Sequence, residues 1–385
     1  MSRSTTPVGL AGQVILQVLP AMGAGGAEQG CLDVACALAQ TGARPIVASS
    51  GGSRVEALIS GGADHITLPL AGKTPQALIA NTARLLHLIR KHDVALVHAR
   101  SRAPAWSAWA ACQQARIPFM TTFHAAYNFN SPMKKLYNTV MARGERVIAI
   151  SEFIAEHIRT NYPSATQRIR IIPRAIDLER HRSDAVSAER IAILVECWGL
   201  DRSRPVILLP GRLSRPKGQM TLVEAMARLE RTDVQCVMVG PDGGDGHFRQ
   251  SLIERISALG LSRQIIVAET CHDMPAAYLL ADVVVVASTQ PEGFGRVAVE
   301  AQAMGRPVIA TALGGLIELV KHGNTGWLIP PGNPEALAEA LTHALEQTPS
   351  VREAMSARAV ANVCPRYALK NMTDATLAVY SELIL

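Results

Sequence analysis

Two carboxylates and a glycine-rich turn lie close together in one stretch of the chain, residues 288–305 (STQPEGFGRVAVEAQAMG). The apolar run that ends at Ser288 predicts a strand, and the spacing of Val297, Ala301 and Met304 predicts a helix that follows the turn. A helix that starts just after a glycine loop offers backbone N–H groups and a positive end to an anion. The stretch therefore predicts a phosphate site.

The two carboxylates frame this predicted site, with Glu292 in the turn and Glu300 just over one turn into the helix. At about 1.5 Å of rise per helical residue, plus the width of the turn, they should lie on the order of 10 Å apart. That separation suits an elongated ligand with one end near Glu292, a diphosphate over the helix start and a hydroxyl-rich group near Glu300, and a sugar nucleotide has that shape. The alternative is that Glu292 caps the helix and Glu300 is a solvated surface residue. The backbone groups expected at the diphosphate belong to Gly293, Phe294, Gly295 and Arg296.

Two cations follow an apolar run at residues 205–210 that predicts another strand. Gly211 forms the turn, Arg212 comes next, and Lys217 lies five residues further on. Fixed cations beside a glycine turn can stabilise a departing diphosphate, because negative charge builds on its bridging oxygen as the glycosidic bond breaks.

The N-terminal half begins with an apolar run, residues 14–20, and a glycine turn. This pattern predicts a β-loop-α unit of the doubly wound type. The third glycine of a dinucleotide fingerprint falls on Glu28, and no acid follows the next predicted strand, residues 45–49, so NAD binding is not expected.

Polar residues also stand at the ends of two later strands, where open α/β sheets bind ligands. Arg100 and Arg102 follow the predicted strand at residues 94–98 and are candidates for a carboxylate or phosphate on an acceptor. The alternative is that both arginines lie on a solvated loop. His124 ends a further strand, as either a structural hydrogen bonder or a catalytic group.

The string PEGFGRVAVEAQAMGRPVIAT resembles the nucleotide-sugar motif of the family 4 (group 1) glycosyltransferases, whose two glutamates are separated by seven residues, as Glu292 and Glu300 are here. The resemblance extends from the loop at residues 25–28 to about Trp327. It implies the α/β fold called GT-B, two Rossmann-like β/α/β domains facing each other across a cleft. The expected parts are an acceptor-binding domain at 1–180, a linker at 181–204, a nucleotide-sugar domain at 205–365, and a helix at 366–385 that packs back on the first domain.

The resemblance also implies roles for individual residues. Arg212 and Lys217 would contact the diphosphate, Glu292 the donor-sugar hydroxyls and Glu300 the ribose. His124 matches a T-x-H motif whose histidine lies near the reacting sugar. The acceptor-side loop would contain Gly25, Gly26 and Glu28.

Three residues depart from the family pattern. Ala125 stands after His124 where relatives usually have glycine. Arg174 and Ala175 replace the Asn and Gly of an IPNGID segment. Arg174 would point a charge toward the cleft, or form a salt bridge.

The expected reaction is transfer of a hexosyl group, with retained anomeric configuration, from GDP-mannose or a UDP-hexose to a glycan or glycolipid. No cofactor or metal is expected, because cationic side chains and a helix end supply the charge. The strings HARSRAPAWSA, MPAAY and FGRVAVEAQAMGRPVIA resemble a bacterial subgroup that assembles lipopolysaccharide core or other surface glycans. Two alternatives stay open: a non-catalytic nucleotide-sugar-binding protein, and a sugar-nucleotide epimerase of the same fold.

Composition is consistent with a cytoplasmic enzyme of two domains. The 385 residues are 48% apolar, and the seven cysteines include no C-x-x-C pair, which indicates reduced thiols. No apolar stretch reaches the roughly 18 residues of a membrane helix, and the N-terminus does not resemble a signal peptide. The net charge of +6 could favour a peripheral contact with anionic membrane, or simply serve diphosphate binding. Nucleic acid is not expected, since aromatic residues make up only 4%.

Overall fold

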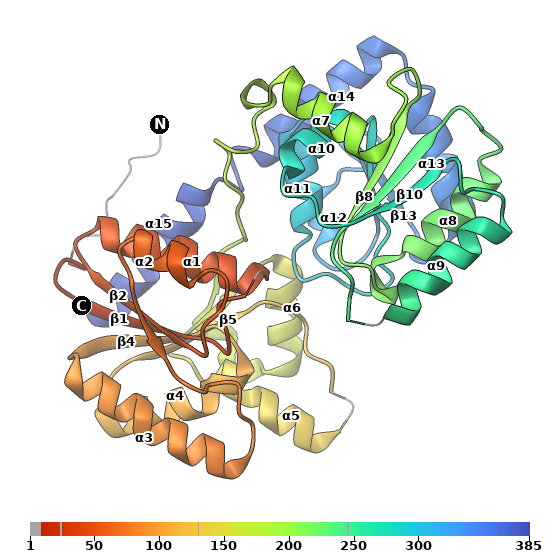
Figure 1. The fold of residues 1–385 in the computed structure, drawn as a ribbon. Coiled ribbons are helices and arrows are strands. Elements are labelled where there is room, and N and C mark those ends of the chain that lie inside the picture. The colour runs from red at the N-terminus through yellow and green to blue at the C-terminus, as the bar shows by residue number, and fades with distance from the viewer. Residues whose placement is uncertain (1–8, 24, 130, 245) are drawn as a thin grey trace. The chain divides into compact units, whose positions relative to one another are not determined.

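The computed structural model describes residues 9–385 apart from residues 24, 130 and 245. The chain divides into two compact units (Figure 1). The first runs up to Arg174 and is completed by Leu369–Leu385, and the second is Ala175–Ala368. Each unit is described separately below.

The first unit is built on a sheet of seven parallel strands in the order β3-β2-β1-β4-β5-β6-β7. The reversal of strand order beside β1 is typical of doubly wound folds. The strands are β1 (Val14–Val18), β2 (Arg44–Ser49), β3 (Asp64–Thr67), β4 (Val94–Ala99), β5 (Phe119–Phe123), β6 (Arg146–Ala149) and β7 (Ile169–Ile171).

Helices cover both faces of this sheet, with α1, α2 and α15 on one face and α3 and α4 on the other (Figure 1). The helices are α1 (Gly26–Gln40), α2 (Val55–Ser60), α3 (Pro75–Lys91), α4 (Arg102–Ala115), α5 (Pro132–Asn138), α6 (Glu152–Asn161) and α15 (Leu369–Ile384), with 3₁₀ turns at Thr139–Ala142 and Pro163–Arg168.

The second unit repeats this plan with six parallel strands in the order β10-β9-β8-β11-β12-β13. The switch point lies beside β8, so loops after β8 and β11 come together at one edge of the sheet. The strands are β8 (Val206–Pro210), β9 (Gln235–Val239), β10 (Ile265–Ala268), β11 (Val283–Val286), β12 (Val308–Thr311) and β13 (Gly326–Ile329).

Its helices also form two layers, with α8, α9 and α13 on one face and α7, α10, α11 and α14 on the other (Figure 1). The helices are α7 (Ala188–Trp198), α8 (Gln219–Arg228), α9 (Gly246–Ala258), α10 (Met274–Leu280), α11 (Arg296–Ala303), α12 (Leu316–Leu319), α13 (Pro334–Leu345) and α14 (Pro349–Val363), with 3₁₀ turns at Ser183–Ala185 and Arg215–Lys217.

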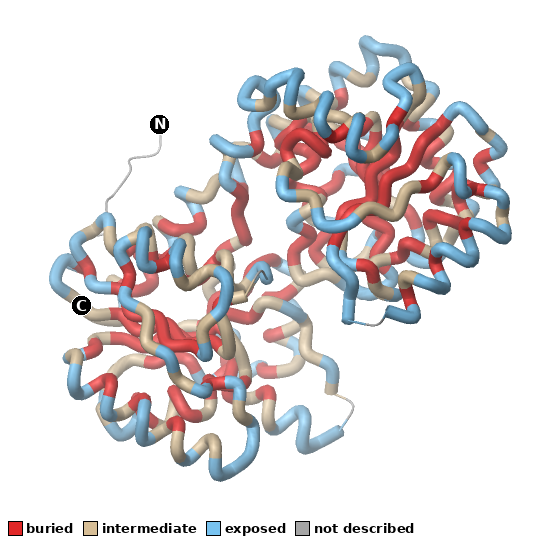
Figure 2. The backbone as a smooth tube through the Cα atoms, in the orientation of Figure 1, coloured by how far each residue is buried: buried red, intermediate tan, exposed pale blue. Residues whose placement is uncertain are grey.

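The central strands are buried on both faces, which is why their sequences are continuous apolar runs rather than alternating ones. β11, with the sequence VVVV, is buried at every position, and Figure 2 shows the same burial through the middle of both sheets. The hydrophobic effect therefore fixes the positions of the strand ends, and these ends present the polar loops.

The predicted fold class is confirmed, because two Rossmann-like units with parallel sheets are present. Residues 181–204, expected as a linker, contain α7 and belong to the second unit. α15 belongs to the first unit, where the Tyr380 hydroxyl is 2.7 Å from Nδ1 of His98. Within the described residues, no helix has the length and apolar character needed to cross a membrane.

Candidate active site

A lysine–glutamate pair joins the loops that follow β8 and β11. Lys217 is the last residue of the 3₁₀ turn Arg215–Lys217, and its Nζ donates to Oε1 of Glu292 over 2.6 Å. The hydroxyl of Ser288 donates to the same oxygen. The side chains of Lys217 and Glu292 are 32% and 18% exposed, so both remain accessible from one side. The structure thus brings together two of the predicted residues.

Close backbone approach holds these two loops against each other. Gly218 has φ +73°, and a Cβ atom there would lie only 1.9 Å from the carbonyl oxygen of Ala287. The N–H of Thr289 donates to the carbonyl of Pro216 over 2.8 Å. A side chain at position 218 would separate the loops, so glycine is required for Lys217 to reach Glu292.

The predicted helix start is confirmed at α11, which begins at Arg296 with Gly295 as its N-cap. Gly295 has φ +102°, and a Cβ atom there would lie 2.5 Å from Cδ2 of Leu316. Phe294 is buried and packs edge-on against Tyr367, with ring centroids 5.4 Å apart. The loop is therefore anchored by its apolar residue, and the first N–H groups of α11 follow directly after Glu292 and Gly293.

Glu300 lies on the buried side of α11 and is only 5% exposed. The hydroxyl of Tyr278 donates to its Oε2 over 2.7 Å, and Nε of Arg296 donates to its Oε1 over 2.5 Å. Nε2 of His181, also buried, is 3.8 Å from Oε1. The alternative of a solvated surface glutamate is wrong, because this carboxylate is held by three side chains.

Burial and the neighbouring Glu300 carboxylate raise the pKa of Tyr278 well above its ordinary value. The phenol therefore stays protonated and acts as a hydrogen-bond donor at any physiological pH. With Arg296 it leaves the Glu300 carboxylate fixed in one orientation, which is what a group that binds ligand hydroxyls requires.

Arg212 is placed differently from Lys217. Its backbone carbonyl accepts a hydrogen bond of 2.9 Å from Nε2 of Gln219, and its side chain is exposed. Among the described residues the Arg212 guanidinium has no hydrogen bond or ion pair. Gly211 lies beneath the stem of Lys217, since a Cβ atom there would be 3.6 Å from Cδ of that lysine.

In the first unit the predicted residues lie at the ends of β1, β4 and β5. Arg100 is 5% exposed, and its Nε donates to Oε1 of Gln17 over 2.5 Å. Arg102 donates to Oδ1 of Asn138 over 2.9 Å, and its guanidinium lies 4.3 Å from the centre of the Tyr127 ring. The alternative of a solvated loop is wrong for both arginines, because they are engaged inside the unit.

His124 follows β5, and its Nδ1 is 3.4 Å from Nη1 of Arg174. Burial, Arg174 and Arg100, in that order, hold the pKa of His124 well below its ordinary value. Because a guanidinium can only donate, Nδ1 accepts and the proton of the neutral ring sits on Nε2. Arg174, the departure from the family pattern, therefore contacts another predicted residue directly.

The glycine loop of the first unit opens α1. Gly25 is the N-cap, Gly26 is the first helical residue and Glu28 lies in the first turn. A Cβ atom on Gly25 would lie 2.3 Å from Oε2 of Glu28, so the carboxylate folds back over the loop. Gly25 and Gly26 are exposed, which leaves this helix start open to a ligand.

Two residues that contact or approach Glu300 were not predicted from the sequence to do so. From the sequence, Tyr278 is noted only within the string MPAAY and His181 only as the first residue of the expected linker, yet both reach the carboxylate. Both are distant from Glu300 in sequence, and no local pattern reveals a contact between separate elements. A weak signal exists for Tyr278, since a tyrosine on an otherwise apolar helix needs a partner for its hydroxyl.

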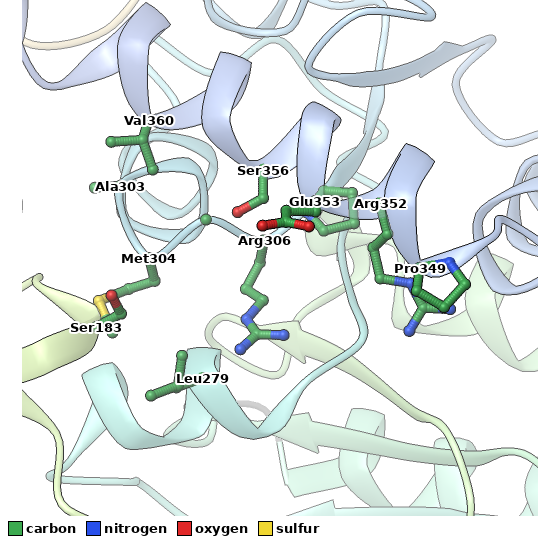
Figure 3. Close-up of a pocket in the computed structure, with 12 residues that line it drawn as sticks. Ser183, Leu279, Ala303, Met304, Arg306, Pro349, Arg352, Glu353, Ser356 and Val360 are labelled. Carbon is green, nitrogen blue, oxygen red and sulfur yellow. The ribbon is translucent and has the colours of Figure 1, made fainter.

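Two hollows of the second unit differ in their relation to this site. One of about 420 Å³ lies at the ends of β9 and β10 and is lined by Asp242, Arg249, Glu269 and His272, among others. Another of about 420 Å³ begins at the C-terminal end of α11, with Arg306, Arg352 and Ser356 in its lining (Figure 3). The second hollow contains none of the predicted residues.

Two Rossmann-like units and a lysine–glutamate pair beside a helix start are the features expected of a GT-B glycosyltransferase. The sequence profile "Glycosyltransferase Family 4" matches residues 24–180, and "Glycosyl transferases group 1" matches residues 194–361. The chain belongs to this family of glycosyltransferases and is an enzyme of that class.

Among solved structures, a glycosyltransferase from Rickettsia africae ESF-5 is 33% identical, with a TM-score of 0.90 over 97% of this chain and 99% of that one. HepE from Anabaena, crystallised with UDP-glucose, is 25% identical, with a TM-score of 0.83 over 96% of this chain and 100% of its own. The D-inositol 3-phosphate glycosyltransferase of Salinispora arenicola is 28% identical over 88% of this chain and 80% of its own length.

Proposed function

We propose that the enzyme transfers a hexosyl group from a UDP-hexose to a hydroxyl of a glycan or glycolipid, with retention of anomeric configuration. The buried Glu300 carboxylate, fixed by Tyr278 and Arg296, is the observation that carries the proposal. Such a carboxylate can accept both hydroxyl protons of a ribose. The UDP-glucose complex of HepE supports uridine over the guanosine of GDP-mannose.

In the proposed reaction the second unit activates the donor. The diphosphate binds at the start of α11 and draws Nζ of Lys217 away from Glu292, whose freed carboxylate accepts donor-sugar hydroxyls. The exposed Arg212 closes on the same diphosphate. These cations, together with the helix end, stabilise the charge on the leaving oxygen without a metal or cofactor. The base occupies the hollow at the ends of β9 and β10.

The acceptor is proposed to bind the first unit at the open start of α1, near Gly25, Gly26 and Glu28. Because Arg100 and Arg102 are engaged inside the unit, they are not proposed to touch the acceptor. The role in lipopolysaccharide or surface-glycan assembly rests on sequence resemblance.

The donor test uses Glu300→Gln, which keeps the shape of the side chain and removes its charge. Donor and nucleotide binding are measured by thermal shift with UDP-glucose, UDP-galactose, UDP-N-acetylglucosamine and GDP-mannose, and turnover by nucleotide release. Loss of a charged hydrogen-bonded partner should weaken donor binding by about 10- to 100-fold. Glu339→Gln, at an exposed position of α13, is the matched control and should bind as the wild type does.

The outcomes separate the alternatives. A UDP-sugar that stabilises the wild type and not Glu300→Gln supports the proposed site. No stabilisation by any nucleotide would overturn it. Binding without turnover would favour a non-catalytic protein, and a changed donor sugar without acceptor would favour an epimerase. Retention is read from the anomeric configuration of the product by NMR.

We also propose that the first unit touches anionic membrane through α5. Met133 and Leu136 are 82% and 62% exposed, and Lys134 and Lys135 stand beside them. Exposed apolar residues flanked by lysines suit an interface with anionic lipid. The fraction of protein that sediments with vesicles containing phosphatidylglycerol should fall several-fold for Met133→Ser/Leu136→Ser.

The membrane proposal fails if the wild type does not sediment with these vesicles, or if the double variant sediments equally well. Ile79→Ser, an exposed apolar residue of α3, is the control.

A further inference from the structure

Two buried donors in the first unit lack a partner. Within the described residues, Nη2 of Arg100 and Nε2 of His124 are both buried and neither has a hydrogen-bond partner. Arg100 is 5% exposed, and its Nε donates to the neutral amide oxygen of Gln17. A buried guanidinium N–H without a partner is costly, since the donor has lost its water and gained nothing in return.

Arg100 and His124 line the same small cavity, which has a volume of about 20 Å³. That is enough for one water molecule or one monatomic ion and too little for a sugar. The polar side chains in its lining are those of Arg100, Arg174, His124, Thr122 and Thr376, and the rest of the lining is glycine and apolar residues. No acidic side chain is among the described residues that line it.

The groups around the cavity favour a negative occupant. Arg100 and Arg174 each carry a full positive charge and are 5% and 7% exposed. His124 presents Nε2–H, because its Nδ1 faces Nη1 of Arg174 at 3.4 Å. The hydroxyl of Thr122 is 2.7 Å from Nε2 of His98 and is already engaged. A water molecule would need acceptors for its own two protons, whereas an anion needs donors only.

We propose that this cavity is a binding site for a monovalent halide anion, held by Nη2–H of Arg100 and Nε2–H of His124. The anion offsets the charge of the two arginines in a low-dielectric surrounding, where Coulomb attraction is strong. It lies within the first unit and is independent of the donor chemistry proposed above, so neither proposal depends on the other.

The test measures thermal unfolding of the full chain in sodium gluconate, with chloride or bromide replacing gluconate at constant ionic strength. A site that binds only the folded protein should raise Tm with the logarithm of halide concentration above its Kd, by about 5 to 10 °C when halide reaches 100 times that Kd. Gluconate is too large for the cavity and corrects for ionic strength. A Tm that does not distinguish halide from gluconate would overturn the proposal.

The matched variants are Arg100→Met and Arg102→Met. Arg100→Met keeps the length of the side chain and removes the donor, so the halide response should disappear. Arg102 is a neighbouring arginine engaged with Asn138 and Tyr127, and Arg102→Met should keep the response. Equal loss in both variants, or an unchanged response in Arg100→Met, would contradict the assignment.

Crystals of the wild type grown in bromide give a second readout that does not depend on how the variants fold. The proposal expects an anomalous peak inside the cavity, at hydrogen-bonding distance from Arg100 and His124. A peak absent from this position, or density that refines as water, would refute a halide site even if bromide raised Tm.

Discussion

The two units handle buried charge in opposite ways. In the second unit each critical carboxylate is matched by a cation, Glu292 by Lys217 and Glu300 by Arg296. In the first unit the buried Arg100 meets a neutral amide, and His124 faces the guanidinium of Arg174. The two carboxylates of the second unit are therefore paired with cations in the absence of a ligand, whereas the cavity of the first unit is positive.

The difference matters for how a ligand can bind. Under the proposed function, a diphosphate would have to compete with Glu292 for Lys217. The pair would then lower the affinity for phosphate alone and couple diphosphate binding to the release of a carboxylate. A positive cavity has no internal competitor and simply gains from an anion. The paired carboxylates of the second unit suit a substrate that must leave. The positive cavity of the first unit suits an ion that stays bound.

The largest effect is expected from breaking the Lys217–Glu292 pair of the second unit. Lys217→Ala removes the cation proposed to stabilise the leaving diphosphate, and transfer should slow by about 100- to 1,000-fold. The rate of nucleotide release by the variant and by the wild type is measured at a saturating concentration of the donor. Arg215→Ala is the control, because Arg215 lies in the same 3₁₀ turn with its guanidinium 6.0 Å from the ring of Phe248. Equal losses in both variants would mean that general positive charge, rather than Lys217, drives the reaction.

Much of the second unit's site could be predicted from sequence because its parts are local. The turn at Glu292, the helix start at Arg296 and the position of Glu300 follow from glycine placement and helical spacing within one stretch. What could not be predicted is the pairing of Lys217 with Glu292, since they lie on loops after different strands. That contact depends on strand order, which places β8 beside β11.

The first unit was less predictable for a related reason. Its strands β1, β2 and β4 followed from local patterns. Arginines after a strand, however, look the same in sequence whether they face solvent or the interior. The burial of Arg100 is decided by its contact with Gln17 on another strand, and that of Arg174 by α1, whose Gly30 would place a Cβ atom 3.3 Å from its guanidinium.

A smaller effect is expected at the positive cavity of the first unit, on the pKa of His124. Arg174 is one cause of the lowered pKa of His124, after burial, so Arg174→Met should move that pKa up toward its ordinary value. Imidazole ¹⁵N NMR should show a wild-type ring that stays neutral between pH 5 and 8 with its proton on Nε2, and a variant ring that begins to titrate. Arg170→Met is the control, because Arg170 pairs with Glu382.

The same change should alter how stability depends on pH. A folded-state pKa below the unfolded value of about 6.5 means that the unfolded chain binds more protons, so stability falls as pH drops below about 6.5. Raising the pKa of His124 in the folded state reduces its difference from the unfolded value. The loss of Tm between pH 6.5 and 5 should therefore be smaller in Arg174→Met than in the wild type. A ring that titrates normally in the wild type would show that Arg174 and Arg100 do not control it, and the contrast between the two units would then rest on Arg100 alone.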